Sequence, residues 1–383
     1  MKCKSYVAGA AMLAAMSGVA MADNWPDLPI GIKNGFAAQV GETLYTGLGS
    51  AGQDVYKLDL GNLEAGWQKV AAFAGPAPSQ PAAAVSGGKI YVFSGSGNET
   101  EDSKSPVVFD TAYRYDPESD SWERLATTVP VGLLGASAVA RSDSSIAIFG
   151  GYNKQLFDKY LADITAIDKE RDPEAWNKTV QDFMGMKPKD YHWNDLVLLY
   201  KPETNDWTDL GRTPFLPNTG AALVDLGGDK IALINGEVKP GLRTDMAKTV
   251  DFSGEAAEWD QLPPLPSGHS GSRQEGVAGA YAGLVGDALI VAGGANFPGA
   301  RDAADSGNWF AHDGLSKTWN SDVFMLADGQ WTLIGQLPEG LAYGASFSLP
   351  EGVLIVGGED GERNARTDVF LLSVENGAVI TTQ

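Results

Sequence analysis

Apolar residues along this chain recur in short runs that end in glycine or other small residues. The runs are "TLYTGLG", "KIYVFSGSG", "SIAIFGG", "KIALING", "ALIVAGG" and "VLIVGG", and a second apolar segment such as "AYRYDP" or "DVFMLAD" follows each one. A tryptophan follows five of these second segments, at Trp67, Trp122, Trp207, Trp259 and Trp331. Segments that alternate small and apolar residues, such as "GASAVA" and "GASFSL", lead into the next run, as expected of tightly packed strands. The pattern predicts six units of four short strands.

A unit of four strands that repeats every roughly 50 residues describes a propeller blade. The glycine pair, the second apolar segment and the tryptophan resemble the Kelch repeat. We therefore expect an all-β fold, a six-bladed Kelch-type β-propeller, as a single domain over residues 23–383. Two segments compete for the last strand of the ring, "WPDL" (Trp25 to Leu28) and "AVITT" (Ala378 to Thr382).

The length differences between the units fall after the glycines, between the second and third strands of a blade. In an antiparallel blade these loops emerge on the same face as the crossovers between blades. The third insertion, "KQLFDKYLADITAIDKERDPEAWNKTVQDFMG", has apolar residues at helical spacing and a break at Pro173. It predicts two helices at the rim of a pocket that opens on this face near the axis.

The first residues predict export. "MKCKSYVAGAAMLAAMSGVAMA" joins two lysines to an apolar run and ends in Ala20-Met21-Ala22, which is typical of a secretory signal peptide. We expect residues 1–22 to be removed, a mature chain that begins near Asp23, and a periplasmic location. The only cysteine, Cys3, lies in the removed part, so we expect no disulfide. No other apolar stretch is long enough to span a bilayer.

The chain is strongly acidic, with 49 acidic against 28 basic residues and a net charge of −21. This charge disfavours nucleic acids and anionic membranes as partners. A small acidic substrate remains possible, because one arginine in a concave site outweighs a distant, screened field. The three histidines are scattered and form no metal-binding motif, so no metal is expected.

Glu237 and Arg243 stand out in "LINGEVKPGLRTD", where a bare turn would need neither charge. Both lie at the root of the fourth insertion, on the elaborated face. A carboxylate there can take a proton from a hydroxyl, while a guanidinium can grip an anion. Spacing alone is equally consistent with a pair that only holds the loop together.

"LINGEVKPGLRTD", "LGSAGQDVYKLD", "AHDGLSKTWNSDV" and "AIDK" resemble segments of the N-acetylneuraminate epimerase (sialic acid mutarotase) family of periplasmic propellers. The resemblance implies interconversion of the α and β anomers of N-acetylneuraminate, with Glu237 as proton acceptor and no cofactor or metal. Arg243 is the first candidate for binding the substrate carboxylate and Arg301 the second. His312 is a candidate donor to the ring oxygen or the acyl oxygen. Where similar members carry an arginine in the first crossover, this chain has "APSQ", which weakens the case for carboxylate recognition by that blade.

Other classes fit less well. A sialidase would carry Ser-x-Asp-x-Gly-x-x-Trp boxes, and "ADGQW" is one residue short of that pattern. A copper oxidase of the galactose oxidase type needs His, Tyr and Cys groups that the mature chain lacks. A Kelch module that only binds another protein remains the non-enzymatic alternative.

Overall fold

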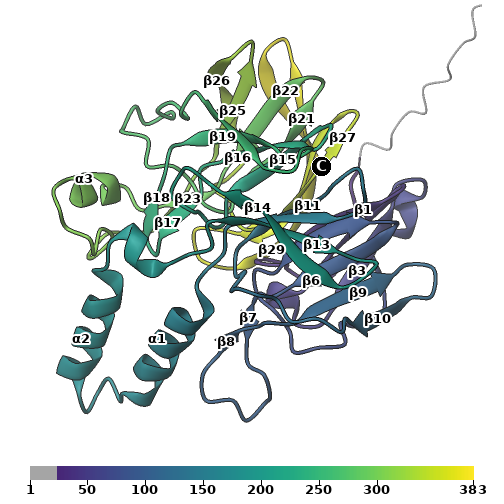
Figure 1. The fold of residues 1–383 in the computed structure, drawn as a ribbon. Coiled ribbons are helices and arrows are strands. Elements are labelled where there is room, and N and C mark those ends of the chain that lie inside the picture. Colours follow the sequence, from purple (N-terminus) through teal and green to yellow (C-terminus); the bar gives the residue numbers. More distant parts are fainter. Residues whose placement is uncertain (1–23) are drawn as a thin grey trace, which may run out of the picture.

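The computed structural model describes residues 24–383, so the predicted signal peptide lies outside the described part of the chain. Six four-stranded antiparallel sheets follow one another along the chain, and each takes its strands in sequence order (Figure 1). This confirms the six-bladed propeller. Among the described residues, no helix is long and apolar enough to cross a membrane.

Each blade is one continuous stretch of chain. Blades one to three comprise β1 (Phe36–Val40), β2 (Thr43–Gly47), β3 (Val55–Asp59) and β4 (Gln68–Lys69); β5 (Ala82–Ser86), β6 (Lys89–Phe93), β9 (Ala112–Asp116) and β10 (Ser121–Arg124); and β11 (Ser137–Ala140), β12 (Ile146–Phe149), β13 (Leu196–Lys201) and β14 (Asp206–Arg212). Blades four to six comprise β15 (Ala222–Gly227), β16 (Lys230–Ile234), β19 (Ala247–Asp251) and β20 (Glu258–Leu262); β21 (Tyr281–Val285), β22 (Ala288–Ala292), β25 (Asp322–Ala327) and β26 (Gln330–Gln336); and β27 (Ala345–Leu349), β28 (Gly352–Glu359), β29 (Ala365–Glu375) and β30 (Ala378–Thr382).

The first strand of each blade lies innermost. Strand β5 contacts β1 and β11, while β21 contacts β15 and β27. Just before these strands, six backbone groups form a closed ring around the axis, in which each N–H donates to the carbonyl of the preceding blade at 2.7–2.9 Å. The ring residues all have positive φ and are Asn34, Gln80, Gly135, Gly220, Gly279 and Tyr343.

The five tryptophans lie on the outer strands or, for Trp67, directly before one. Trp122 lies opposite Tyr115, Trp207 opposite Tyr200, Trp259 opposite Val250 and Trp331 opposite Leu326. Four indole N–H groups reach the preceding crossover: Trp67 donates to Pro26 O, Trp122 to Ala71 O, Trp207 to Thr127 Oγ1 and Trp331 to Pro263 O, whereas the buried Trp259 Nε1 has no partner among the described residues. Equivalent positions were expected from the repeat, and the strand pairing of the last four confirms them.

Both ends of the chain take part in closing the ring. The outer strand of blade six is β30, which pairs with β29, so the C-terminal segment takes the strand position left open by the sequence. The N-terminal segment takes the crossover position instead. Leu28 N donates to Thr367 O at 2.8 Å, as Phe73 N does to Gln53 O and Leu265 N to Asp245 O.

The long insertion of blade three forms α1 (Lys154–Ala166) and α2 (Pro173–Met184), as predicted. The side chains of Asn153 and Asp172 cap the two helices, and Pro173 starts the second one. Tyr160 and Phe183 stack at 3.9 Å between them. The pair projects away from the blades (Figure 1). A further short helix, α3 (Ala300–Asp305), was not predicted.

Three two-stranded ribbons stand at the roots of the insertions. They are β7 (Ser96–Gly97) with β8 (Val107–Val108), β17 (Glu237–Lys239) with β18 (Leu242–Arg243), and β23 (Ala295–Asn296) with β24 (Thr318–Trp319).

Candidate functional site

A cavity of about 400 Å³ lies over the axial ring, on the face that carries the insertions. The ring residues Asn34, Gln80 and Tyr343 line it, because their left-handed backbone directs these side chains to the axis. Left-handed φ is uncommon outside glycine and costs about 1 kcal/mol or more, so retained examples often mark functional sites. The charged residues of the lining are Glu237, Arg243, Lys317 and Glu359.

A tight turn places Glu237 at the cavity wall. Asn235 and Gly236 follow β16 with φ of 57° and 93°, and a Cβ on Gly236 would lie 2.7 Å from Thr219 O. Glycine is therefore required where the chain leaves the strand. The chain then resumes pairing, because Glu237 N donates to Thr219 O at 2.8 Å and Thr219 N donates to Glu237 O at 2.9 Å.

Both carboxylate oxygens of Glu237 are held from the protein side. Tyr152 donates its hydroxyl to Oε2 at 2.9 Å, and Gly241 N donates to Oε1 at 3.0 Å. Arg243 NH1 lies 2.7 Å from Oε1 but without hydrogen-bond geometry, so this contact is an ion pair. The side chain of Glu237 still exposes 16% of its surface. The group is fixed yet open to a ligand.

Arg243 lies across the ribbon from Glu237, in register with it. Its side chain is only 4% exposed. Nε donates to Ala295 O at 3.1 Å, NH2 donates to the Tyr343 hydroxyl at 3.4 Å, and the guanidinium lies over the Phe297 ring. Burial opposes the charge, but Glu237 and Tyr343 outweigh it and raise the pKa of Arg243. The group therefore stays a cation that orients Glu237.

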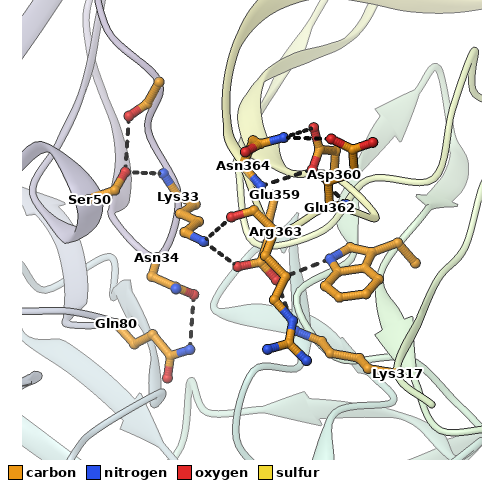
Figure 2. A network of polar contacts seen from close by, with 12 residues as sticks. Lys33, Asn34, Ser50, Gln80, Lys317, Glu359, Asp360, Glu362, Arg363 and Asn364 are labelled. Atoms are coloured by element: carbon orange, nitrogen blue, oxygen red, sulfur yellow. Dashed lines mark hydrogen bonds and ion pairs between the residues drawn. The ribbon is translucent and has the colours of Figure 1, made fainter.

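Glu359 is a second carboxylate of the cavity, and Figure 2 shows lysines approaching it from two sides. Lys33 Nζ lies 2.6 Å from Oε2 and Lys317 Nζ lies 3.0 Å from Oε1, where the Trp319 indole also donates. Burial alone would raise the pKa of Glu359, but the two ammonium groups lower it below its usual value. The side chain is an ionised anchor for two lysines.

The charges that line this cavity balance. Two carboxylates, Glu237 and Glu359, face two cations, Arg243 and Lys317, while Lys33 pairs with Glu359 from outside the lining. In a chain of net charge −21, the two cations of the lining give an anionic ligand a partner at this place.

Arg301 and His312 do not line this cavity, so their expected roles in substrate binding stay predictions. Arg301 pairs with Asp245 at 2.5 Å and donates to Gln274 O, lining a neighbouring cavity instead. His312 lies against Gly241, between the rings of Phe297 and Phe310. Burial lowers the pKa of His312, and Lys239 adds to this effect. Sequence placed both residues on the correct face but could not tell the direction of their side chains.

The helices α1 and α2 do not cap the cavity either, since none of their residues lines it. Their insertion contributes Tyr152, which precedes α1, and Met184 O, which accepts from the buried Lys239 Nζ at 2.7 Å. Burial lowers the pKa of Lys239 to about 8. The insertion thus supports the β17–β18 ribbon from behind.

Sequence reasoning missed Tyr152, Tyr343, Lys317 and Glu359. A signal existed for two of them. Glu359 follows "VGG" as Glu237 follows "ING", and Tyr152 follows "FGG", and all three residues line the cavity. No local pattern marks Lys317 or Tyr343. Within residues 24–383, no group of three or more His, Cys, Asp or Glu side chains is arranged to hold a metal ion.

Comparison with known proteins gives a consistent result. The family model of N-acetylneuraminate epimerase matches residues 25–381. An N-acetylneuraminate epimerase of Brucella melitensis is 54% identical over 99% of this chain and 98% of that protein. One of Vibrio vulnificus is 50% identical over 95% of this chain and 94% of that protein. The solved structure titled "Structure of YjhT" superposes with a TM-score of 0.86 at 36% identity, covering 94% of this chain and 99% of that one.

Proposed function

Because the chain belongs to the N-acetylneuraminate epimerase family, we propose that its axial cavity interconverts the α and β anomers of N-acetylneuraminate by opening and reclosing the sugar ring. Family membership makes the chain an isomerase. The observation that carries the anomer chemistry is a partly exposed, fixed carboxylate in a cavity that two cations also line.

Glu237 is the base of this proposal. Ring opening removes the proton of the C2 hydroxyl while the ring oxygen gains one, and C2 becomes a ketone. Reclosure on the other face of the ketone gives the other anomer. Glu237 suits the first transfer because Tyr152, Gly241 and Arg243 fix the carboxylate and leave one side to the cavity. A positioned base of this kind contributes about 10² to 10⁴ in rate.

Lys317 is better placed than Arg243 to bind the substrate carboxylate. The terminal nitrogens of Arg243 already contact Glu237 and Tyr343, and its side chain is nearly closed off from solvent. The Lys317 side chain is 20% exposed and rests on the Trp319 and Tyr343 rings, with Glu359 on one side only. An ammonium has three donors, so two remain for a carboxylate.

The cellular setting is part of the same proposal. Residues 1–22 have the form of a secretory signal, and the repeat has the Kelch signature, so we place the mature enzyme in the periplasm as a Kelch-type propeller. The strongly acidic composition of the chain disfavours nucleic acid as a partner.

Exchange spectroscopy by NMR tests the activity without purifying an anomer. The C3 protons of the two anomers of N-acetylneuraminate give separate signals, and catalysed interconversion transfers magnetisation between them. The purified chain should speed this transfer far above the rate in buffer. A chain that binds the sugar without speeding exchange would be a binding module, and one that cleaves sialosides would be a sialidase.

A further inference from the structure

Ring opening needs a proton donor for the ring oxygen, and we propose that this donor is the phenol of Tyr343. The inference rests on the proposed function, because it names the acid that works with Glu237. Four features of the cavity carry it: the fixed position of the ring, its link to the base, its free hydroxyl hydrogen and the cations around it.

The axial ring fixes Tyr343. Its N–H donates to Gly279 O at 2.7 Å and its carbonyl accepts from Asn34 N at 2.8 Å, while φ is 63°. A Cβ at position 279 would overlap the phenol ring of Tyr343, so glycine is required there to leave room for that side chain. A tyrosine held in the left-handed region is strained, and strain of this kind is retained where function requires it.

One guanidinium links the phenol to the base. Arg243 NH2 donates to the Tyr343 hydroxyl at 3.4 Å, and NH1 of the same group lies 2.7 Å from Glu237 Oε1. The two substrate oxygens that exchange protons are both bonded to C2, so acid and base must stand close together. The shared guanidinium meets this requirement.

The hydroxyl hydrogen of Tyr343 has no acceptor among the described residues, since the oxygen only accepts from Arg243. Tyr152 differs, because its hydrogen is given to Glu237 Oε2. Burial and the Glu237 charge also raise the pKa of Tyr152 well above its usual value. Of the two phenols that line the cavity, Tyr343 is the one with a proton to give.

The step balances without a further reactant. Glu237 takes the proton of the C2 hydroxyl, the C2–O carbonyl forms as the bond from C2 to the ring oxygen breaks, and Tyr343 gives its proton to that oxygen. Reclosure on the other face reverses both transfers, so Glu237 and Tyr343 return to their starting states.

Charged groups surround the phenol. Arg243 contacts the hydroxyl, and Lys317 Nζ lies 4.4 Å from the ring centroid. Behind these cations stand Glu237 and Glu359, and Lys33 contacts Glu359 from the far side. Among these groups, Arg243 is the one that contacts the phenol oxygen.

Tyr343→Phe tests the proposal, since it keeps the ring and removes the hydroxyl. By NMR exchange we expect kcat to fall by about 10² to 10⁴, with KM changed by no more than about threefold. Tyr152→Phe removes the other phenol of the cavity, and because Tyr152 acts only through Glu237, its kcat should fall less than that of Tyr343→Phe.

3-Fluorotyrosine at position 343 gives a second test that leaves the packing intact. Because it keeps the hydroxyl, this chain should keep kcat within about tenfold of wild type, whereas Tyr343→Phe should not. The proposal is overturned if Tyr343→Phe stays within tenfold of wild type, or if the 3-fluorotyrosine chain loses as much rate as Tyr343→Phe. A wild-type chain that does not speed anomer exchange would instead overturn the proposed function.

Discussion

Replacing Glu237 by glutamine separates the catalytic role of this residue from its structural role. Glutamine keeps the shape, and its one carbonyl oxygen can still accept from Gly241 N while its NH2 group donates to the Tyr152 hydroxyl, but it cannot take up a proton as the carboxylate does. The loss of a positioned base should lower kcat by about 10² to 10⁴, which is a rise of about 3 to 5 kcal/mol in the barrier.

The same substitution should also lower stability. It leaves the guanidinium of Arg243, whose side chain is 4% exposed, without its counter-charge. Breaking a buried pair from one side costs about 3 to 5 kcal/mol, and the retained hydrogen bonds favour the low end. For a chain of 383 residues, a loss of about 3 kcal/mol lowers Tm by about 4 °C.

A double variant tells these effects apart. Adding Arg243→Met to Glu237→Gln removes the stranded charge, so we expect Tm to recover most of the loss while the rate does not recover. NMR exchange gives the rates and calorimetry gives Tm. If Glu237→Gln lowers Tm but equilibrates the anomers at the wild-type rate, the pair only holds the ribbon, and the base lies elsewhere in the cavity.

Two further predictions follow from buried groups near the site. Burial lowers the folded-state pKa of Lys248 to about 8, whereas the unfolded chain keeps its proton to about 10.5. Between pH 8 and 10.5 the lysine is neutral in the folded chain and charged in the unfolded chain, so unfolding takes up a proton. This lysine therefore raises the free energy of unfolding by about 3 kcal/mol as the pH rises over that range. Chemical denaturation should show a smaller rise for Lys248→Met, and an unchanged slope would refute the shift. Gly241→Ala should cost about 1 to 3 kcal/mol and slow anomer exchange, because φ is 80° and the added Cβ would overlap His312. Full activity and unchanged Tm would contradict this.

Local information was enough for the blades. The strands of a blade, with their glycines and tryptophan, recur every roughly 50 residues. The repeat therefore predicted the six blades and the equivalent positions of Trp122 and Trp331. Apolar residues at helical spacing and Pro173 likewise predicted α1 and α2, because both signals are local to the insertion. The turn at Asn235–Gly236 marked Glu237, although its role came from the family resemblance.

Contacts between distant segments decided the rest. Lys33 and Glu359 are 326 residues apart, and Arg243 and Tyr343 are 100 apart, so no local pattern could pair them. The direction of Arg301 toward Asp245, and of His312 against Gly241, depends on packing against neighbouring loops. Closure needed both chain ends, because β30 completes the last sheet while Leu28 supplies its crossover. The sequence determined the blades and marked Glu237, and the closed ring determined which side chains meet at its axis.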